Sequence, residues 1–119
     1  MQRDMELIRQ ILLAIEATPN ETLPEEPTIT GSSDRLVAYH LALLRQAGLI
    51  EMINYEGEHR IVYGQIGLAW QGHEFLAAAR DSDIWQKAKT RLGGIFSTVT
   101  LALLQELLIS EAKRRLGLP

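Results

Sequence analysis

Apolar residues recur with helical spacing over residues 34–47, the most clearly patterned stretch of the chain. Val37, Leu41 and Leu44 fall at i, i+4 and i+7, which is the spacing of a buried stripe on an amphipathic helix. The opposite side carries Arg35, Ala38, Tyr39, Ala42, Arg45 and Gln46. Gly48 follows, and glycine adopts the left-handed conformation that ends a helix at little cost. We therefore expect a helix over residues 34–47 with one buried face and one outward face.

An apolar, β-branched stretch follows this helix directly. Apolar and aromatic residues lie on both sides of Glu56-Gly57-Glu58: Ile50, Met52, Ile53 and Tyr55 before it, and Ile61, Val62 and Tyr63 after it. This pattern predicts a β-hairpin over residues 50–66 with Gly57 in the turn. A helix that ends in Ala-Gly-Leu-Ile and runs into a strand is typical of the join between the recognition helix and the wing of a winged helix-turn-helix.

The remaining apolar patterns predict helices over residues 4–17, about 69–80, 83–92 and 97–116. Pro24 and Pro27 fall where a second helix of a helix-turn-helix would lie, so that helix is expected to be shortened or missing. The sequence thus predicts an α+β, mostly helical fold: a winged helix-turn-helix with a β-hairpin wing and three C-terminal helices. We expect a single domain over residues 1–119, with a core at about 4–80 and a helical extension at about 81–117.

Ser32 and Ser33 precede the central helix, and either hydroxyl suits an N-cap. The same free amides of a first helical turn can also hold a phosphate. If the chain binds double-stranded DNA, the candidate contacts are Ser32, Ser33, Arg35, Tyr39 and Arg45 in the major groove and His59 and Arg60 at the wing.

The distribution of charge along the chain argues against DNA binding. The net charge is −3, made up of −4 over residues 1–31, −1 over residues 32–69 and +2 over residues 70–119. Neutralisation of phosphates drives non-specific DNA binding, and the expected recognition segment is not basic. The predicted wing tip places Glu56 and Glu58 beside Arg60, which makes it a poor phosphate ligand.

The last predicted helix is apolar around more than half of its circumference. Such a wide stripe exceeds what one small core covers, which favours a homodimer with Leu101, Leu104 and Leu108 as candidate contacts. The alternative is that the first and fourth helices cover the stripe within one chain.

The sequence contains no recognisable catalytic or metal-binding pattern. The chain has no cysteine, which excludes disulfides and thiolate sites. His73-Glu74 begins the zinc motif H-E-x-x-H, but residue 77 is Ala, so the second histidine ligand is missing. We therefore expect a binding module rather than an enzyme, with no cofactor and no metal. Neither a signal peptide nor a membrane span is recognisable, so we expect a cytoplasmic location and no membrane partner.

Four stretches carry a resemblance to a known family: Arg3-Asp4-Met5 with Leu7-Ile8-Arg9 and Ile11-Leu12; Tyr39-His40 with Leu43-Leu44 and Ala47-Gly48-Leu49-Ile50; Trp70-x-Gly72-His73-Glu74-Phe75-Leu76 with Ala78-Ala79-Arg80; and Trp85-x-Lys87-Ala88-Lys89. They resemble a small family, frequent in phages and prophages, catalogued as domain of unknown function 2513 and of winged-helix character. The resemblance implies a winged-helix fold and a phage or prophage context, and it assigns no activity or site residue. Two hypotheses follow: a DNA-binding transcriptional regulator, or a protein–protein adaptor on the same scaffold whose partner is a host or phage protein, with Tyr39, Tyr55 and the last helix as the contact groups.

Overall fold

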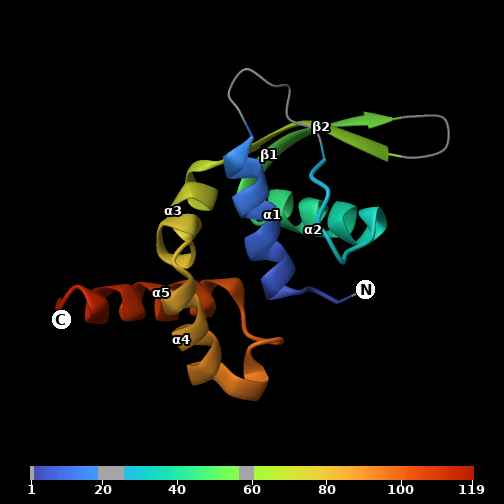
Figure 1. Cartoon of the computed structure of the whole chain (residues 1–119). Helices are drawn as coiled ribbons and strands as arrows, with labels where there is room; N and C mark the ends of the chain where they lie inside the picture. Colours follow the sequence, from blue (N-terminus) through green and yellow to red (C-terminus); the bar gives the residue numbers. More distant parts are fainter. Residues whose placement is uncertain (1, 19–25, 57–60) are drawn as a thin grey trace. The chain divides into compact units, whose positions relative to one another are not determined.

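The structure, a computed structural model, describes residues 2–18, 26–56 and 61–119 (Figure 1). Its elements are, in chain order, α1 (Met5–Ala17), α2 (Asp34–Gln46), β1 (Ile50–Glu56), β2 (Ile61–Leu68), α3 (Trp70–Ala79), α4 (Ser82–Leu92), the 3₁₀-helix η1 (Gly93–Ile95) and α5 (Leu101–Arg115). The strands form one antiparallel pair. The fold is therefore α+β and mostly helical, as the sequence predicted.

The chain divides into two compact units, Met1–His73 and Glu74–Pro119. The division falls inside α3, earlier than the boundary near residue 80 that the sequence suggested. The first unit contains α1, α2 and the hairpin, and the second contains α4, η1 and α5.

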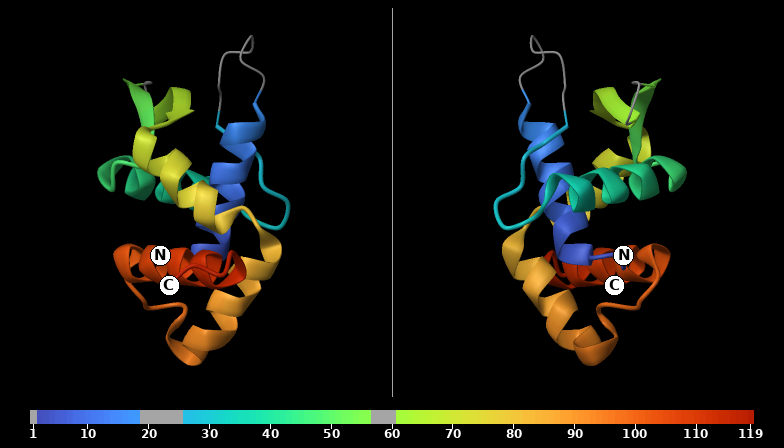
Figure 2. Two further views of the ribbon diagram at one scale, coloured as in Figure 1. Left: turned by 90° about the vertical axis from the view of Figure 1, so that its left-hand side faces the viewer. Right: turned by 90° about the vertical axis from the view of Figure 1, so that its right-hand side faces the viewer.

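In the first unit, two helices pack beneath the hairpin. Helix α2 contacts β1, and α1 contacts both α2 and β2; the side views show α1 and α2 crossing steeply (Figure 2). The core consists of the predicted apolar stripes, all at most 8% exposed: Met5, Ile8, Leu12 and Ile15 of α1, and Val37, Leu41 and Leu44 of α2. From the hairpin side, Leu49, Ile50, Met52 and Ile66 are also buried. These elements are held together by the burial of apolar side chains, which contributes about 25 cal/mol for each Å² of apolar surface removed from water.

The hairpin is tied to the start of α3 by backbone contact. The carbonyl of Leu49, just before β1, accepts a hydrogen bond of 2.9 Å from the amide of Ala69, just after β2. A Cβ built on Gly72 would lie 2.1 Å from the same carbonyl oxygen, far inside van der Waals contact. Gly72 is therefore the residue that lets the start of α3 approach the hairpin.

The segment before α2 contains no helix over residues 26–33. Pro24, where the sequence predicted a shortened or missing second helix, lies outside the described residues, and Pro27 is not in a helix. Residues 26–29 have no regular secondary structure, and a turn begins at Thr30. Gly31 has a φ of 86°, a conformation that glycine adopts without strain.

In the second unit, the chain turns at η1 and α5 packs beside α4 (Figure 2). Ile84, Trp85 and Ala88 of α4 are buried, and the rings of Trp85 and Phe96 meet edge to face at 5.6 Å. The last helix begins at Leu101 rather than Ser97, because the hydroxyl of Thr100 caps it by accepting from the amide of Leu103 at 3.1 Å. The residues before it form turns around η1.

Candidate binding surface

Helix α2 begins and ends at residues that the sequence predicted as its boundaries. The hydroxyl of Ser33 accepts a hydrogen bond of 3.1 Å from the amide of Leu36, so Ser33 and not Ser32 is the N-cap. After Gln46 the chain passes through Ala47 to Gly48, whose φ is 80°. These two stops place the outward residues of α2 on a rigid, well-defined helix face.

The structure places five of the seven predicted DNA contacts on or beside α2. Arg35 and Arg45 are exposed, Tyr39 and Ser32 are half-buried, and Ser33 is exposed but engaged as the cap. The other two, His59 and Arg60, lie outside the described residues. The cap also brings Asp34 into the first turn, where its negative charge works against a phosphate at this helix end.

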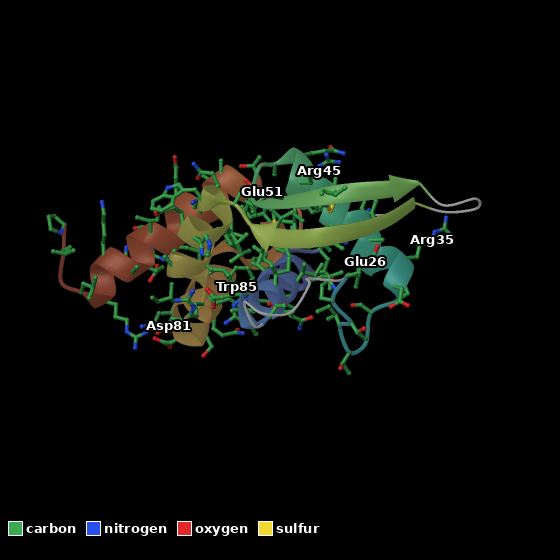
Figure 3. The ribbon with its side chains drawn as sticks, turned by 90° about the horizontal axis from the view of Figure 1, so that it is seen from above. Glu26, Arg35, Arg45, Glu51, Asp81 and Trp85 are labelled. Atoms are coloured by element: carbon green, nitrogen blue, oxygen red, sulfur yellow. The ribbon has the colours of Figure 1, made fainter. Side chains whose placement is uncertain are left out.

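The two arginines do not form a continuous positive strip. Figure 3 shows Arg35 and Arg45 at opposite ends of α2, and ten residues of helix separate them by about 15 Å along the axis. The outward positions between them are Ala38, Tyr39 and Ala42, which are half-buried. The centre of the outer face of α2 therefore carries two alanines and one tyrosine and no charge, and one arginine lies at each end. We call this set, Arg35, Ala38, Tyr39, Ala42 and Arg45, the α2 face.

His40 has a structural role that the sequence pattern did not reveal. Its ring is fully buried, with Nδ1 2.9 Å from the carbonyl oxygen of Leu36 and Nε2 2.8 Å from the amide nitrogen of Asp4. A carbonyl only accepts and an amide N–H only donates, so the proton must reside on Nδ1 and the ring is neutral. The imidazole thus joins the start of α1 to α2 directly behind the α2 face, and the ring of Tyr39 packs edge-on against it at 5.5 Å. A partner 36 residues away leaves no local signal in the sequence.

The model of a family described as "Hypothetical protein (DUF2513)" matches residues 2–94, which is most of the chain. The chain belongs to this DUF2513 family. A relative in Haemophilus influenzae (strain ATCC 51907 / DSM 11121 / KW20 / Rd), named "Uncharacterized protein", is 38% identical over 95 residues, covering 77% of this chain and 79% of the relative. No solved structure matches the chain.

The family number expected from the resemblance is confirmed. The range matched to the DUF2513 family contains the whole α2 face and α4, and it ends in η1. Helix α5 lies beyond that range.

On α5, the structure corrects the choice of residues for self-association. Leu104 and Leu108 are fully buried within the chain, and Leu101 is half-buried. The exposed large apolar side chains of the helix are instead Leu103 and Ile109, at 49% and 42% exposure. Periodicity located an apolar stripe but could not show which part of it α4 covers. Self-association of the chain stays a prediction.

No catalytic arrangement is evident among residues 2–18, 26–56 and 61–119. No three His, Asp or Glu side chains of that part gather as metal ligands. His73, the candidate zinc ligand of the interrupted motif, is exposed on α3. None of the helices described is long and apolar enough to cross a bilayer.

Sequence reasoning also missed one buried charge, Glu111 of α5. Its side chain is 6% exposed and pairs with Arg91 of α4. Position 111 lies one turn past Leu104 and Leu108 on the buried stripe, so helical spacing could have indicated that a carboxylate falls on the covered side.

Proposed function

We propose that this DUF2513 protein is a non-enzymatic binding module of winged-helix type, and that the α2 face binds another protein. The order of a capped helix, a two-stranded hairpin and a further helix supports the winged-helix assignment. The resemblance to a family frequent in phages and prophages makes a host or phage protein the proposed partner.

The observation that carries this proposal is the charge of the unit that contains α2. Residues 1–73 include five basic and ten acidic side chains, a net charge of −5. A surface of that sign repels the phosphate backbone, whose neutralisation supplies most of the affinity of DNA-binding proteins. The α2 face has an uncharged centre with half-buried Tyr39 and an arginine at either end, and aromatic and arginine side chains are the groups enriched at protein–protein hot spots.

The decisive experiment places a photo-crosslinking amino acid at Tyr39 of the full chain in cells that carry the gene, with the same amino acid at exposed Gln10 of α1 as the matched control. We expect one discrete protein adduct from position 39 and none from position 10. The substitution Ala42→Arg should abolish that adduct, because it places a bulky cation in the uncharged centre, whereas Gln10→Arg should leave it intact. Circular dichroism checks that both variants are folded. Equal adducts from both positions, or an adduct that survives Ala42→Arg, would contradict the proposal.

DNA binding is the second candidate, favoured by the exposed guanidinium groups of Arg35 and Arg45. The contacts would be Ser32, Ser33, Arg35, Tyr39 and Arg45, with His59 and Arg60 of the expected wing. Fluorescence anisotropy with a pool of random-sequence duplexes tests it directly. Binding that falls steeply with added salt, and that weakens several-fold in Arg35→Ala but not in Arg9→Ala, would replace the protein-binding proposal with this one.

A further inference from the structure

A groove lies on the outward side of α5, and its volume is about 500 Å³. Every residue that lines it is exposed and belongs to the second compact unit. The lining includes Glu106, Ile109, Ser110 and Lys113 of the helix and Leu118 and Pro119 of the turn that follows. We call this hollow the α5 groove.

The turn after α5 forms one wall of the α5 groove. The amide of Leu118 donates a hydrogen bond of 2.7 Å to the carbonyl oxygen of Lys113. The amide of Gly117 donates one of 3.1 Å to the carbonyl oxygen of Arg114, and Gly117 has a φ of 71°. These bonds are the Schellman ending of a helix, which folds the chain back over its last turn. Leu118 and Ile109 are 55% and 42% exposed, so the groove keeps apolar surface in contact with water.

Two opposite charges, Glu106 and Lys113, lie in the α5 groove. Neither forms an ion pair within residues 2–18, 26–56 and 61–119, whereas the neighbouring Arg114 pairs with Glu111. Glu106 and Lys113 are seven residues apart, which is about 10 Å along a helix axis. Ion pairs within a helix form between residues three or four apart, so these two charges remain available to a partner.

The arrangement of these charges is complementary to a second copy of itself. Glu106 and Lys113 lie at equal distances on either side of the midpoint between Ile109 and Ser110. If two copies of α5 lie antiparallel with a two-fold axis at that midpoint, Glu106 of each copy meets Lys113 of the other. The Ile109 side chains of the two copies then meet beside the axis, and the small Ser110 side chains let the helices approach closely. In a parallel pair like charges would face each other, so the charges favour the antiparallel orientation.

We propose that the chain forms a two-fold symmetric dimer in which the α5 helices of two copies lie antiparallel, each in the α5 groove of the other. Two Glu106–Lys113 ion pairs flank a central contact between the two Ile109 side chains. Leu104 and Leu108, which the sequence suggested as contacts, stay covered within each chain.

The length of α5 sets the expected strength of this dimer. The helix has 15 residues and is therefore about 22 Å long. An interface of that length falls at the small end of specific protein interfaces, so the dimer should dissociate in the micromolar range. The α5 groove includes no residue of the α2 face, so the dimer does not depend on what that face binds.

Sedimentation equilibrium of the full chain over a range of micromolar concentrations tests the proposal. The wild-type chain should dimerise at the upper end and dissociate on dilution. Glu106→Lys and Lys113→Glu should each weaken association at least about tenfold, because each replaces two attractive pairs by two repulsive ones. Glu74→Lys is the matched control, since it reverses an exposed charge of α3 outside the groove, and it should leave association unchanged.

An equimolar mixture of the two reversed-charge variants separates this arrangement from a folding defect. The Glu106→Lys chain carries only cations at the two positions and the Lys113→Glu chain only anions. The mixture should therefore form a mixed dimer about as tight as the wild type, although neither variant dimerises alone. The double variant should also dimerise like the wild type, because exchanging the charges preserves both pairs.

Cysteine substitution tests the position of the two-fold axis. The chain has no cysteine, so Ile109→Cys introduces its single thiol, and two copies beside the axis should form a disulfide on mild oxidation. Ala102→Cys is the matched control, at an exposed position near the start of the same helix. In the antiparallel pair its two copies lie about 20 Å apart, too far for a disulfide, which requires Cα atoms within about 7 Å.

Four results would overturn the proposal. The first is a wild-type chain that stays monomeric at every concentration. The second is reversed-charge variants that associate like the wild type, and the third is a mixture of the two that does not associate. The fourth is a disulfide that forms at position 102 but not at position 109, which would show a parallel pair of helices.

Discussion

Replacing Gly72 by alanine is the sharpest test of how the hairpin meets α3. The added Cβ would lie 2.1 Å from the carbonyl oxygen of Leu49, 3.2 Å from the carbonyl carbon and 3.3 Å from the Cδ2 atom of Leu68. The nearest of these atoms is backbone, which cannot rotate away as a side chain would. The start of α3 and the turn before β1 would have to separate.

The expected loss follows from three contributions. Overpacking a core typically costs about 1 to 3 kcal/mol. Separation also weakens the hydrogen bond from the amide of Ala69 to Leu49, worth about 0.5 to 1.5 kcal/mol net. Against these, alanine favours a helix over glycine by about 1 kcal/mol. We therefore expect Gly72→Ala to lower the free energy of unfolding by about 1 to 3 kcal/mol, opposite in sign to the usual effect of this substitution in a helix.

Urea unfolding followed by far-ultraviolet circular dichroism measures this change. Gly94→Ala is the matched control, because a Cβ at Gly94 meets nothing within 4 Å and the residue has no positive φ; its stability should stay the same or rise slightly. Hydrogen exchange at the amide of Ala69 should accelerate in Gly72→Ala alone. A Gly72→Ala protein as stable as the wild type would refute the close approach of α3 to the hairpin.

Three further outcomes are expected. His40→Ala should lower the free energy of unfolding, measured with urea, by about 2 kcal/mol or more, because it leaves the amide of Asp4 without its buried acceptor and opens a cavity. Nitrogen NMR of the wild-type imidazole should show the neutral form protonated at Nδ1. Ser33→Ala should lower the free energy of unfolding by about 1 kcal/mol, because it removes the N-cap of α2. Hydrogen exchange should become faster only in the first turn of that helix. Hydrogen bonds from the amides of Ile84 and Asp83, together with Arg115, hold the pKa of Asp81 in the folded protein below its ordinary value of 3.8. The stability that ionised Asp81 contributes is therefore fully present above pH 3.8 and is lost as the pH falls through its lower pKa in the folded state. Asp81→Asn should remove this part of the acid dependence of the melting temperature, and an unchanged acid dependence in the variant would contradict the prediction.

The local elements could be predicted because their signals are local. The apolar spacing of α1 and α2 and the stop at Gly48 each act within a few residues, and they were confirmed. The sequence left the cap of α2 open between Ser32 and Ser33, and the structure shows that it is Ser33. The hairpin also followed from its pattern, although the pairing register is irregular between Glu51 and Ile53.

Long-range partners were beyond the same reasoning. His40 falls within the helix predicted over residues 34–47, and nothing near it in the sequence indicates the amide of Asp4 as its partner. Glu111 and Arg91 likewise carry no sequence signal of their ion pair, which forms only because packing brings α4 and α5 together. The start of α5 was placed too early, at Ser97, because Ser97 suits a helix start and Val99 adds an apolar residue, whereas the cap at Thr100 decides the actual boundary.

The sequence by itself determined the helices, the hairpin and the acidic balance of the first 73 residues, because backbone propensity, capping and formal charge depend on residues close in the chain or on none at all. Tertiary structure alone decided which leucines of α5 are covered, which histidine nitrogen accepts a hydrogen bond, and which cations surround a buried carboxylate. Burial and pairing are properties of neighbours in space, and a linear pattern specifies the face that turns inward without specifying what it meets there.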